Sequence, residues 1–350
     1  MIRNILEYLE QSVKKYPDKI AFSDAGSQVS YQDLIAQAKA VGTCLADRLS
    51  GATNQPVVIF VDRTLHSLIL FFGTVYSGNF YIPIDVKMPR HRIEAMLRAL
   101  EPKLILSHCA DEKVTTELGF ASQAVTFIDA VSCAPDETKL ANIRARSIDS
   151  DPLCVYYTSG SSGMPKGAIL SHRSVIEMTE QFSSVFSFSD ECIFGNQAAF
   201  DFSVSLKDIF STLKHGAALH ILPTELFTFP VRLIQCLNDK KINTAIWVTS
   251  AMRVIANLNG LDHTLPLYLQ KMLFSGELMP VKVLNYWRKC LPHVQYVNLY
   301  GQSEIAYNCS YYIVDRRFEN HEPLPAGNTF SNIDVFLLDG QGKPAGEGQV

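Results

Sequence analysis

Short apolar runs alternate with amphipathic stretches along the first 180 residues. The runs PVVIFVD (56–62), FYIPI (80–84) and KLILSH (103–108) have few polar positions, which is typical of strands buried on both faces. The stretches 64–77 and 89–100 have the length and the apolar spacing of helices. Buried strands that alternate with helices predict a parallel sheet covered on both faces.

The helix that precedes these runs has a recognisable start. Ser30 stands three residues before Asp33, and apolar residues follow at helical spacing from Leu34 to Leu45. A serine hydroxyl at this position accepts a hydrogen bond from the third backbone amide of a helix. We therefore expect Ser30 to be the N-cap.

The alternation recurs from about residue 190 to residue 314, with apolar strands at 218–222, 244–248, 271–274, 295–300 and 311–315. After residue 316 it changes to polar loops and one further strand, DVFLLD (334–339). The pattern predicts an α/β protein with two α/β units, at 1–187 and 188–315. The beginning of a small β unit is expected at 316–350.

Composition narrows the functional classes. Hydrophobic residues make up 47% of the 350 positions and charged residues 19%, with a net charge of −4 and no basic block, so a nucleic-acid partner is not expected. The uncharged stretch 67–84 is interrupted by Gly78-Asn79 and is interpreted as a buried helix and strand, not a membrane span. The eight cysteines are scattered without a CxxC pair, which favours a reducing, cytoplasmic setting over a zinc or redox site. The amino terminus does not have the pattern of a signal peptide.

The segment VYYTSGSSGMPKG (155–167) is an apolar strand that continues into a loop of hydroxyls, glycines and one lysine. Small residues allow backbone amides to approach phosphate oxygens, and the hydroxyls and Lys166 add hydrogen bonds and positive charge. The segment therefore predicts an anion cradle. It is neither a Walker loop nor a GxGxxG dinucleotide motif. A flexible surface loop is the alternative.

The string TSGSSGMPKG resembles the phosphate-binding signature of the AMP-forming adenylating enzymes, the superfamily of acyl-CoA synthetases, luciferases and amino-acid adenylation domains. The resemblance extends over the whole chain. It implies ATP and Mg²⁺ as cofactors and a catalytic role for Thr158 and Lys166. The residues that it implies for phosphate binding are Thr158, Ser159, Gly160, Ser161, Ser162, Gly163 and Lys166.

Two further segments are similar to motifs of the same superfamily. The stretch 300–304 (YGQSE) resembles its YGxTE motif, with Ser303 in place of threonine and Gln302 where amino-acid activating members usually have proline. Tyr300 is expected to stack on the purine, and Ser303 and Glu304 to hold Mg²⁺. The turn after Phe274 resembles the segment that borders the adenine. The nucleotide-binding residues implied by both segments are Gly276, Glu277, Leu278, Asn298, Tyr300, Gly301, Gln302 and Ser303, with Glu304 as catalytic metal ligand. A strand followed by an ordinary helix cap is the alternative for the YGQSE segment.

The segment FDFS (200–203) resembles the FDxS segment of amino-acid activating members, in which the aspartate receives the α-ammonium group of the substrate. A carboxylate in an apolar pocket needs such a partner. The alternative is that Asp201 caps a helix that begins near Val204. The chain then departs from the pattern, because it is about two residues longer than usual before Ile209-Phe210. The substrate-binding residues implied are Phe200, Asp201, Trp247, Ser275, Leu299 and Tyr307, and the neighbouring Leu273 and Asn308 are expected beside them.

Trp247 and Tyr307 are large, so a small side chain such as that of alanine, glycine or serine is expected in the pocket. Lys207 either reaches an acidic side chain of the substrate or is a solvated helix residue. The segments IWVTSAM and MLFSGELMPV look most similar to D-alanine–carrier protein ligases, with peptide-synthetase adenylation domains almost as near.

The resemblance implies ATP-dependent formation of an aminoacyl-adenylate, release of pyrophosphate, and transfer to the phosphopantetheine thiol of a carrier protein. In this superfamily a small carboxyl-terminal domain with a catalytic lysine follows the point at which the sequence ends, so we expect a large-domain fragment with impaired activity. Two alternatives stay open: an acyl- or aryl-CoA synthetase of the same superfamily, and a non-catalytic nucleotide-binding domain with the same fold.

Overall fold

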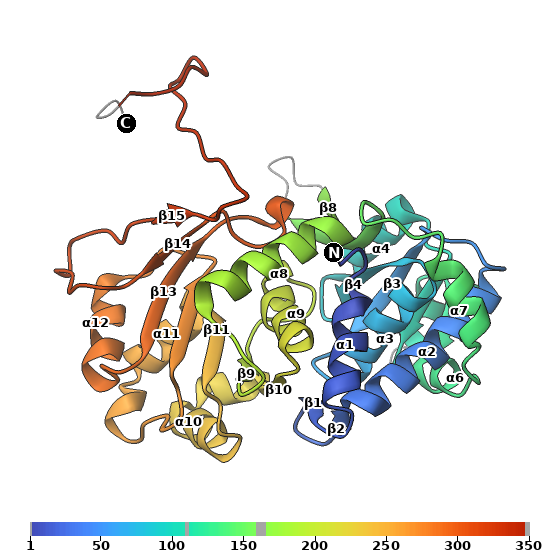
Figure 1. The fold of residues 1–350 in the computed structure, drawn as a ribbon, viewed down its shortest axis with the longest axis horizontal. Coiled ribbons are helices and arrows are strands. Elements are labelled where there is room, and N and C mark those ends of the chain that lie inside the picture. Colours follow the sequence, from blue (N-terminus) through green and yellow to red (C-terminus); the bar gives the residue numbers. More distant parts are fainter. Residues whose placement is uncertain (1, 109–111, 159–165, 347–350) are drawn as a thin grey trace.

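The computed structural model describes residues 2–108, 112–158 and 166–346. Two sheets lie side by side in the molecule, with helices packed on their faces (Figure 1). This arrangement confirms the predicted α/β class.

The smaller sheet contains the three apolar runs in the first part of the sequence. Its strand order is β6-β5-β3-β4-β7-β8, with parallel pairing throughout except for the antiparallel pair β7–β8. The strands are β3 (Pro56–Val61), β4 (Phe80–Asp85), β5 (Leu104–Ser107), β6 (Ala124–Thr126), β7 (Pro152–Thr158) and β8 (Lys166–Ser171).

The larger sheet has the order β15-β14-β13-β12-β11-β9-β10-β1-β2. Its central strands are parallel, and antiparallel pairs occur at both edges. The strands are β1 (Ile20–Ser23), β2 (Gln28–Ser30), β9 (Ile193–Asn196), β10 (Ala218–Ile221), β11 (Thr244–Val248), β12 (Lys271–Ser275), β13 (Gln295–Tyr300), β14 (Ser310–Ile313) and β15 (Asn328–Thr329). The amino-terminal hairpin β1–β2 thus joins this sheet through β10 and crosses the boundary expected at residue 187.

Ser30 caps α2 as predicted, because its Oγ accepts a hydrogen bond from the Asp33 amide at 3.1 Å. No helix within the described residues combines the length and the apolar character needed to cross a bilayer. The α-helices are α1 (Leu6–Lys15), α2 (Tyr31–Arg48), α3 (Leu65–Tyr76), α4 (Arg90–Leu100), α5 (Glu112–Glu117), α6 (Phe127–Val131), α7 (Glu137–Arg144), α8 (His172–Phe186), α9 (Leu206–His215), α10 (Pro230–Asp239), α11 (Thr249–Asn257) and α12 (Val281–Cys290). Short 3₁₀ turns are η2 (Ala121–Gln123), η3 (Ser203–Ser205), η4 (Thr224–Thr228), η5 (Gly260–Asp262) and η6 (Ser303–Ile305).

One apolar core joins the two sheets. Phe72 of α3 stacks on Phe22 of β1 with ring centroids 6.1 Å apart, and it meets Phe210 of α9 edge-on at 6.4 Å. Helices α2 and α3 approach closely at Gly73, where an added Cβ would lie 2.3 Å from the Val41 side chain. Because residues of both sheets line the same core, the two α/β units pack as one body.

The carboxyl-terminal segment departs from the expectation. The strand predicted at 334–339 is not formed, and one bridge between Leu338 and Pro344 is the pairing found there. The apolar side chains of residues 335–338 are exposed, and the segment extends away from the body of the molecule (Figure 1). An apolar run forms a strand only when a second strand is available to pair with it.

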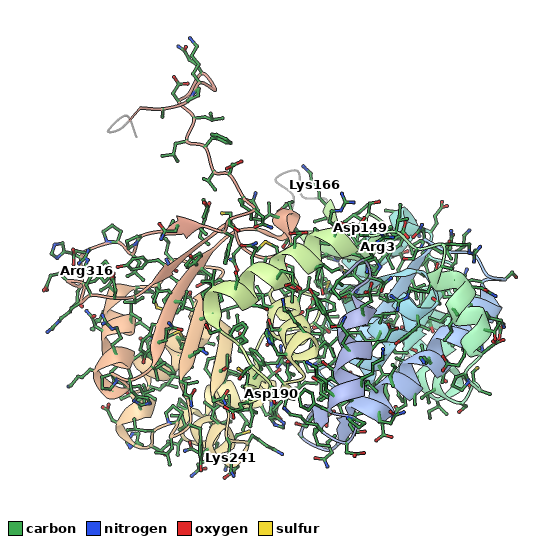
Figure 2. All side chains as sticks on the ribbon, viewed as in Figure 1. Arg3, Asp149, Lys166, Asp190, Lys241 and Arg316 are labelled. Atoms are coloured by element: carbon green, nitrogen blue, oxygen red, sulfur yellow. The ribbon has the colours of Figure 1, made fainter. Side chains whose placement is uncertain are left out.

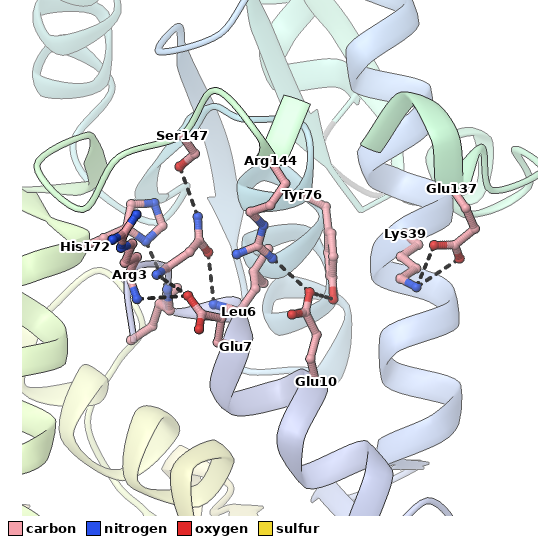
Figure 3. A network of polar contacts seen from close by, with 12 residues as sticks. Arg3, Leu6, Glu7, Glu10, Lys39, Tyr76, Glu137, Arg144, Ser147 and His172 are labelled. Atoms are coloured by element: carbon pink, nitrogen blue, oxygen red, sulfur yellow. Dashed lines mark hydrogen bonds and ion pairs between the residues drawn. The ribbon is translucent and has the colours of Figure 1, made fainter. Parts of the chain in front are cut away.

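Polar contacts fix the amino-terminal helix to α7 and α8 (Figure 3). The Arg144 guanidinium and the Tyr76 hydroxyl both donate to Glu10 Oε1, at 2.8 and 3.2 Å. The Ile5 amide donates to Nδ1 of the buried His172 at 3.2 Å. His172 therefore accepts a hydrogen bond at Nδ1, so this atom carries no proton and the imidazole ring is neutral.

We expect His172 to make stability depend on pH. Burial lowers the pKa of His172 to about 4, so an unfolded chain binds a proton between pH ~6.5 and pH 4 that the folded chain does not. The contribution of His172 to the stability of the folded state is therefore fully present above pH ~6.5 and is lost as the pH falls toward 4. Between these limits the unfolding free energy of the wild type should fall by up to about 3 kcal/mol more than that of His172→Asn. Urea unfolding at pH 7, 5.5 and 4.5 measures the difference.

The asparagine variant is a suitable reference because its side-chain oxygen can still accept from the Ile5 amide. Burial also lowers the pKa values of His215 and His220 to about 4, but both histidines are present in both proteins and their contributions cancel. Parallel pH profiles of the two proteins would show that His172 does not titrate in this way.

Candidate active site

The strand that follows the hydroxyl-rich loop lies against the 3₁₀ turn that contains Glu304. β8 begins at Lys166 and contacts η6 (Ser303–Ile305). Thr158 pairs with Lys166 across β7–β8, and its Oγ1 donates to the Lys166 carbonyl oxygen at 3.4 Å. Lys166 is exposed at the rim of the molecule (Figure 2). The expected phosphate-binding residues Ser159, Gly160, Ser161, Ser162 and Gly163 lie outside the described residues.

A second contact joins the same turn to η3, the 3₁₀ turn before α9. Ser203 Oγ and Ser303 Oγ are 2.9 Å apart, within hydrogen-bonding distance. Glu304 is exposed beside them and forms no ion pair with the described residues. An exposed carboxylate beside a hydroxyl provides the hard oxygen donors that Mg²⁺ prefers.

The backbone around η6 is tight on both sides. A Cβ at Gly301 would lie 2.3 Å from Asn308 Cα, so the two stretches of backbone approach too closely for any other residue. Ala306 has φ 70° and ψ −53°, and the Tyr307 amide donates to the Ile305 carbonyl oxygen at 2.9 Å. These values describe a strained γ-turn, which reverses the chain between exposed Glu304 and buried Tyr307.

The expected adenine-binding residues form an exposed rim at the carboxyl ends of β12 and β13. Gly276 is exposed and has φ +96°, with Val248 Cγ1 3.8 Å from the position of an added Cβ, and Leu278 is 93% exposed. Thr249 Oγ1 holds the Glu277 carbonyl oxygen at 3.1 Å, while the Glu277 carboxylate lies 3.5 Å from the Arg253 guanidinium. Tyr300, at the end of β13, is 60% exposed, which leaves its ring accessible for stacking. Gln302 is also exposed, and the Asn298 amide group donates to the Pro325 carbonyl oxygen at 2.9 Å.

The expected pocket residues lie on opposite faces of the larger sheet. Ser275, Leu299 and Tyr307 are buried on the side of α9, where the Tyr307 hydroxyl donates to the Leu206 carbonyl oxygen at 3.1 Å. Trp247 pairs with Phe274 and points to the opposite face, because successive side chains alternate along a strand. The structure therefore does not bring Trp247 together with the other expected pocket residues. A small substrate side chain was expected because Trp247 and Tyr307 were both assigned to the pocket. Only Tyr307 lies on the α9 side of the sheet.

Asp201 lines a cavity of about 620 Å³ at the carboxyl ends of β3 and β4, together with Arg63 and Asp85. Burial raises the pKa of Asp201 to about 6. Phe200 beside it is buried against Phe71, with ring centroids 6.0 Å apart. Asp201 does not cap a helix, because η3 begins after Phe202 and has no side-chain cap.

The longer spacing of this segment has a structural counterpart. Counted back from Ile209-Phe210 with the usual spacing, the position of the aspartate falls on Ser203, and Ser203 is the residue that contacts Ser303. Asp201 lies two residues earlier and faces the cavity with Arg63 instead. The Arg63 guanidinium donates to the carbonyl oxygens of Asn196 and Leu222, which places this cavity at the carboxyl ends of β9 and β10 as well.

Two ionisable residues of α9 are buried: Asp208, which is not among the site residues expected from the sequence, and Lys207, for which two interpretations were open. Lys207 is 1% exposed and donates from Nζ to Ser275 Oγ at 3.0 Å, so its interpretation as a solvated helix residue is wrong. Asp208 accepts a hydrogen bond from the Asn196 side chain at 3.0 Å, and burial raises the pKa of Asp208 to about 7. All residues from 206 to 213 of α9 are buried, so the polar positions that usually mark the solvent-facing side of a helix do not do so here.

Known proteins match this chain over most of its length. The family described as AMP-binding enzyme matches residues 9–350. Tyrocidine synthase 1 of Brevibacillus parabrevis is 24% identical over 96% of this chain and 30% of that protein, so the chain spans about a third of its length. D-alanine–D-alanyl carrier protein ligase of Listeria monocytogenes serotype 4b (strain F2365) is 27% identical over 99% of this chain and 69% of that protein.

Solved structures show the same fold. The nonribosomal peptide synthetase FmoA3 bound to α-methyl-L-serine-AMP superposes with a TM-score of 0.86 at 19% identity, over 97% of this chain and 38% of that one. The N-terminal subdomain of Klebsiella oxytoca NpsA, in complex with 3-hydroxybenzoyl-AMSN, superposes with a TM-score of 0.81 at 17% identity, over 99% and 85% of the two chains.

Proposed function

The chain belongs to the AMP-binding enzyme family, and we propose that it activates an amino acid with ATP to form an aminoacyl-adenylate. A carboxylate oxygen of the amino acid attacks the α-phosphorus of ATP, the bond to the bridging oxygen breaks, and pyrophosphate leaves. The aminoacyl group then passes to the phosphopantetheine thiol of a carrier protein, with AMP as the leaving group. The observation that carries the proposal is the contact of β8 with η6, which sets Lys166 and Glu304 on adjoining elements.

The chain's own groups align the reactants and neutralise charge, and no protein nucleophile is required. Thr158, Lys166 and the hydroxyls of the loop between them bind the phosphate oxygens. Ser303 and Glu304 hold Mg²⁺, whose positive charge offsets that of the phosphates when it is bound. The exposed Tyr300 ring and the backbone at Gly276 bind the adenine.

The relatives support the amino-acid and carrier-protein parts of the proposal. D-alanine–D-alanyl carrier protein ligases and a tyrocidine synthase are among the matched proteins. Asp201 then receives the substrate ammonium group in the cavity that it lines with Arg63. Burial and the nearby Asp85 carboxylate raise the pKa of Asp201 in spite of the opposing charges of Arg63 and Arg92, so a bound ammonium group would favour the ionised carboxylate.

A second candidate is an acyl- or aryl-CoA synthetase. It is favoured by the position of Asp201, which faces a cavity apart from the Ser203–Ser303 contact. A substrate without an amine would make no use of this carboxylate. A third candidate, a non-catalytic nucleotide-binding domain, predicts no exchange of any acid and no Mg²⁺ dependence of ATP binding.

ATP–pyrophosphate exchange distinguishes these functions. The panel consists of the twenty amino acids, D-alanine, benzoate and a medium-chain fatty acid. We expect exchange with an amino acid, and a loss of about 10- to 100-fold in kcat/KM for Asp201→Ala, because a buried ammonium group without its partner is strongly disfavoured. Asp239→Asn, at the exposed end of α10, is the matched control and should behave like the wild type. Exchange with benzoate or the fatty acid that is indifferent to Asp201→Ala would support the second candidate.

A further inference from the structure

Lys207 is placed where a positive charge is electrostatically disfavoured. It is the second residue of α9, and its side chain is buried beneath the carboxyl end of β12. The first turn of a helix has a partial positive charge, so a cation there is opposed by the helix and by the loss of solvent. A buried, desolvated charge beside a candidate active site indicates a functional role.

The protein does not offer Lys207 an ion pair among the residues that the structure describes. The adjacent carboxylate, Asp208, favours the charged form of Lys207 through its own charge but lies beyond ion-pair distance. Its Oδ2 accepts from the Asn196 side chain at 3.0 Å, and the charge of Arg63 also acts on it. Burial lowers the pKa of Lys207 to about 7, so a bound anion would restore its charged form near neutral pH.

The Ser275 hydroxyl beside Lys207 can also bind an anion. Lys207 Nζ donates to Ser275 Oγ at 3.0 Å, which leaves the hydroxyl proton of Ser275 free for an acceptor. The ammonium group has three N–H donors and uses one of them here. Two adjoining groups therefore have donors that no described residue uses, near the N-terminal end of a ten-residue helix. Such a set binds an anion more strongly than a neutral acceptor and repels a cation.

This pair of groups lies within the candidate active site. Ser275 precedes the Gly276 turn, and Leu206, next to Lys207, accepts from the Tyr307 hydroxyl. Ser203, in the turn η3 before α9, contacts Ser303. We propose that Lys207 and Ser275 form an anion-binding subsite for a second carboxylate of the substrate, so that the activated acid is a dicarboxylic amino acid. The inference rests on the proposed amino-acid activation and specifies the chemical class of the substrate.

Binding of stable adenylate analogues tests the subsite independently of turnover. The probes are the glutamyl, aspartyl, glutaminyl, asparaginyl and alanyl sulfamoyl-adenosines, titrated by calorimetry into wild type and Lys207→Met. In the wild type we expect the glutamyl or the aspartyl analogue to bind about 10- to 100-fold more tightly than its amide counterpart. Lys207→Met should bring this ratio close to one while affinity for the alanyl analogue stays within a few-fold of wild type.

The controls separate selectivity from folding. Lys214→Met, in the last turn of the same helix, should keep the wild-type ratio. If Lys207→Met does not fold, Ser275→Ala provides the second variant, and it should lower the ratio of acid to amide several-fold. A structural role for Lys207 would change stability without changing that ratio.

The outcomes keep the two hypotheses apart. Equal affinity of the wild type for acid and amide analogues, with firm binding of both or of the alanyl analogue, overturns the acidic subsite and leaves amino-acid activation in place. An acid preference that persists in Lys207→Met overturns the assignment to Lys207. Failure to bind any of the five analogues contradicts the proposed function itself, and the subsite with it.

Discussion

Replacement of Glu304 by glutamine is expected to lower ATP–pyrophosphate exchange by about 10²- to 10³-fold at a fixed Mg²⁺ concentration. Glu304 is exposed beside the Ser303 hydroxyl and forms no ion pair with the described residues, so its carboxylate is free to bind the metal. Glutamine keeps the size of the side chain but removes the negative charge. A Mg²⁺ titration of the exchange rate should show a higher half-saturating concentration for the variant.

Glu319→Gln is the matched control, because Glu319 is an equally exposed carboxylate in the loop after β14. It should keep the wild-type rate and Mg²⁺ dependence. AMP affinity without Mg²⁺ should be the same in all three proteins, which would show that the site is intact. An unchanged Mg²⁺ titration for Glu304→Gln would remove Glu304 from the metal site.

Trp247→Ala should destabilise the protein by about 3–5 kcal/mol, because a large buried aromatic side chain is lost and a cavity remains. Trp247 is 0% exposed, packs edge-on against Phe227 at 5.3 Å, and donates from Nε1 to the Gly195 carbonyl oxygen at 2.8 Å. The variant also leaves that carbonyl oxygen without its partner. Urea unfolding followed by circular dichroism measures the change in unfolding free energy.

The same variant tests whether Trp247 contacts substrate. Because its side chain lies on the face of the sheet away from Ser275, the KM of the folded fraction should stay near the wild-type value. Trp247→Phe, which keeps most of the volume, should be less destabilised than the alanine variant. A small loss of stability, below about 1 kcal/mol, together with a changed choice of amino acid would return Trp247 to the pocket.

Elements with a strong local signal were predictable from the sequence. The buried strands at 56–61 and 80–85 form where the apolar runs stand, and Ser30 caps its helix through the expected hydrogen bond. The pairing of β1 with β10 was not predictable, because no local pattern records a contact between segments about two hundred positions apart. The segment at 334–339 shows the converse, since a good strand pattern without a partner stays unpaired.

The candidate site divides in the same way. The motifs predict Thr158, Ser303 and Glu304 as site residues, because each belongs to a short segment with characteristic residue types at fixed spacing. The face to which Trp247 points depends on strand register, and a shift of one position reverses it. The burial of Lys207 depends on where α9 inserts between the sheets, and a lysine in a sequence is usually solvated.

The placement of the first hairpin at the edge of the larger sheet has a consequence for synthesis of the chain. Residues 20–30 leave the ribosome well before β10, the strand with which the hairpin pairs and which ends at Ile221. At translation rates of about 5–20 residues per second, the hairpin waits roughly 10 to 40 s for this neighbour. During that interval Phe22 and its apolar neighbours stand uncovered, so this segment of the nascent chain is a natural client for chaperones that shield hydrophobic segments.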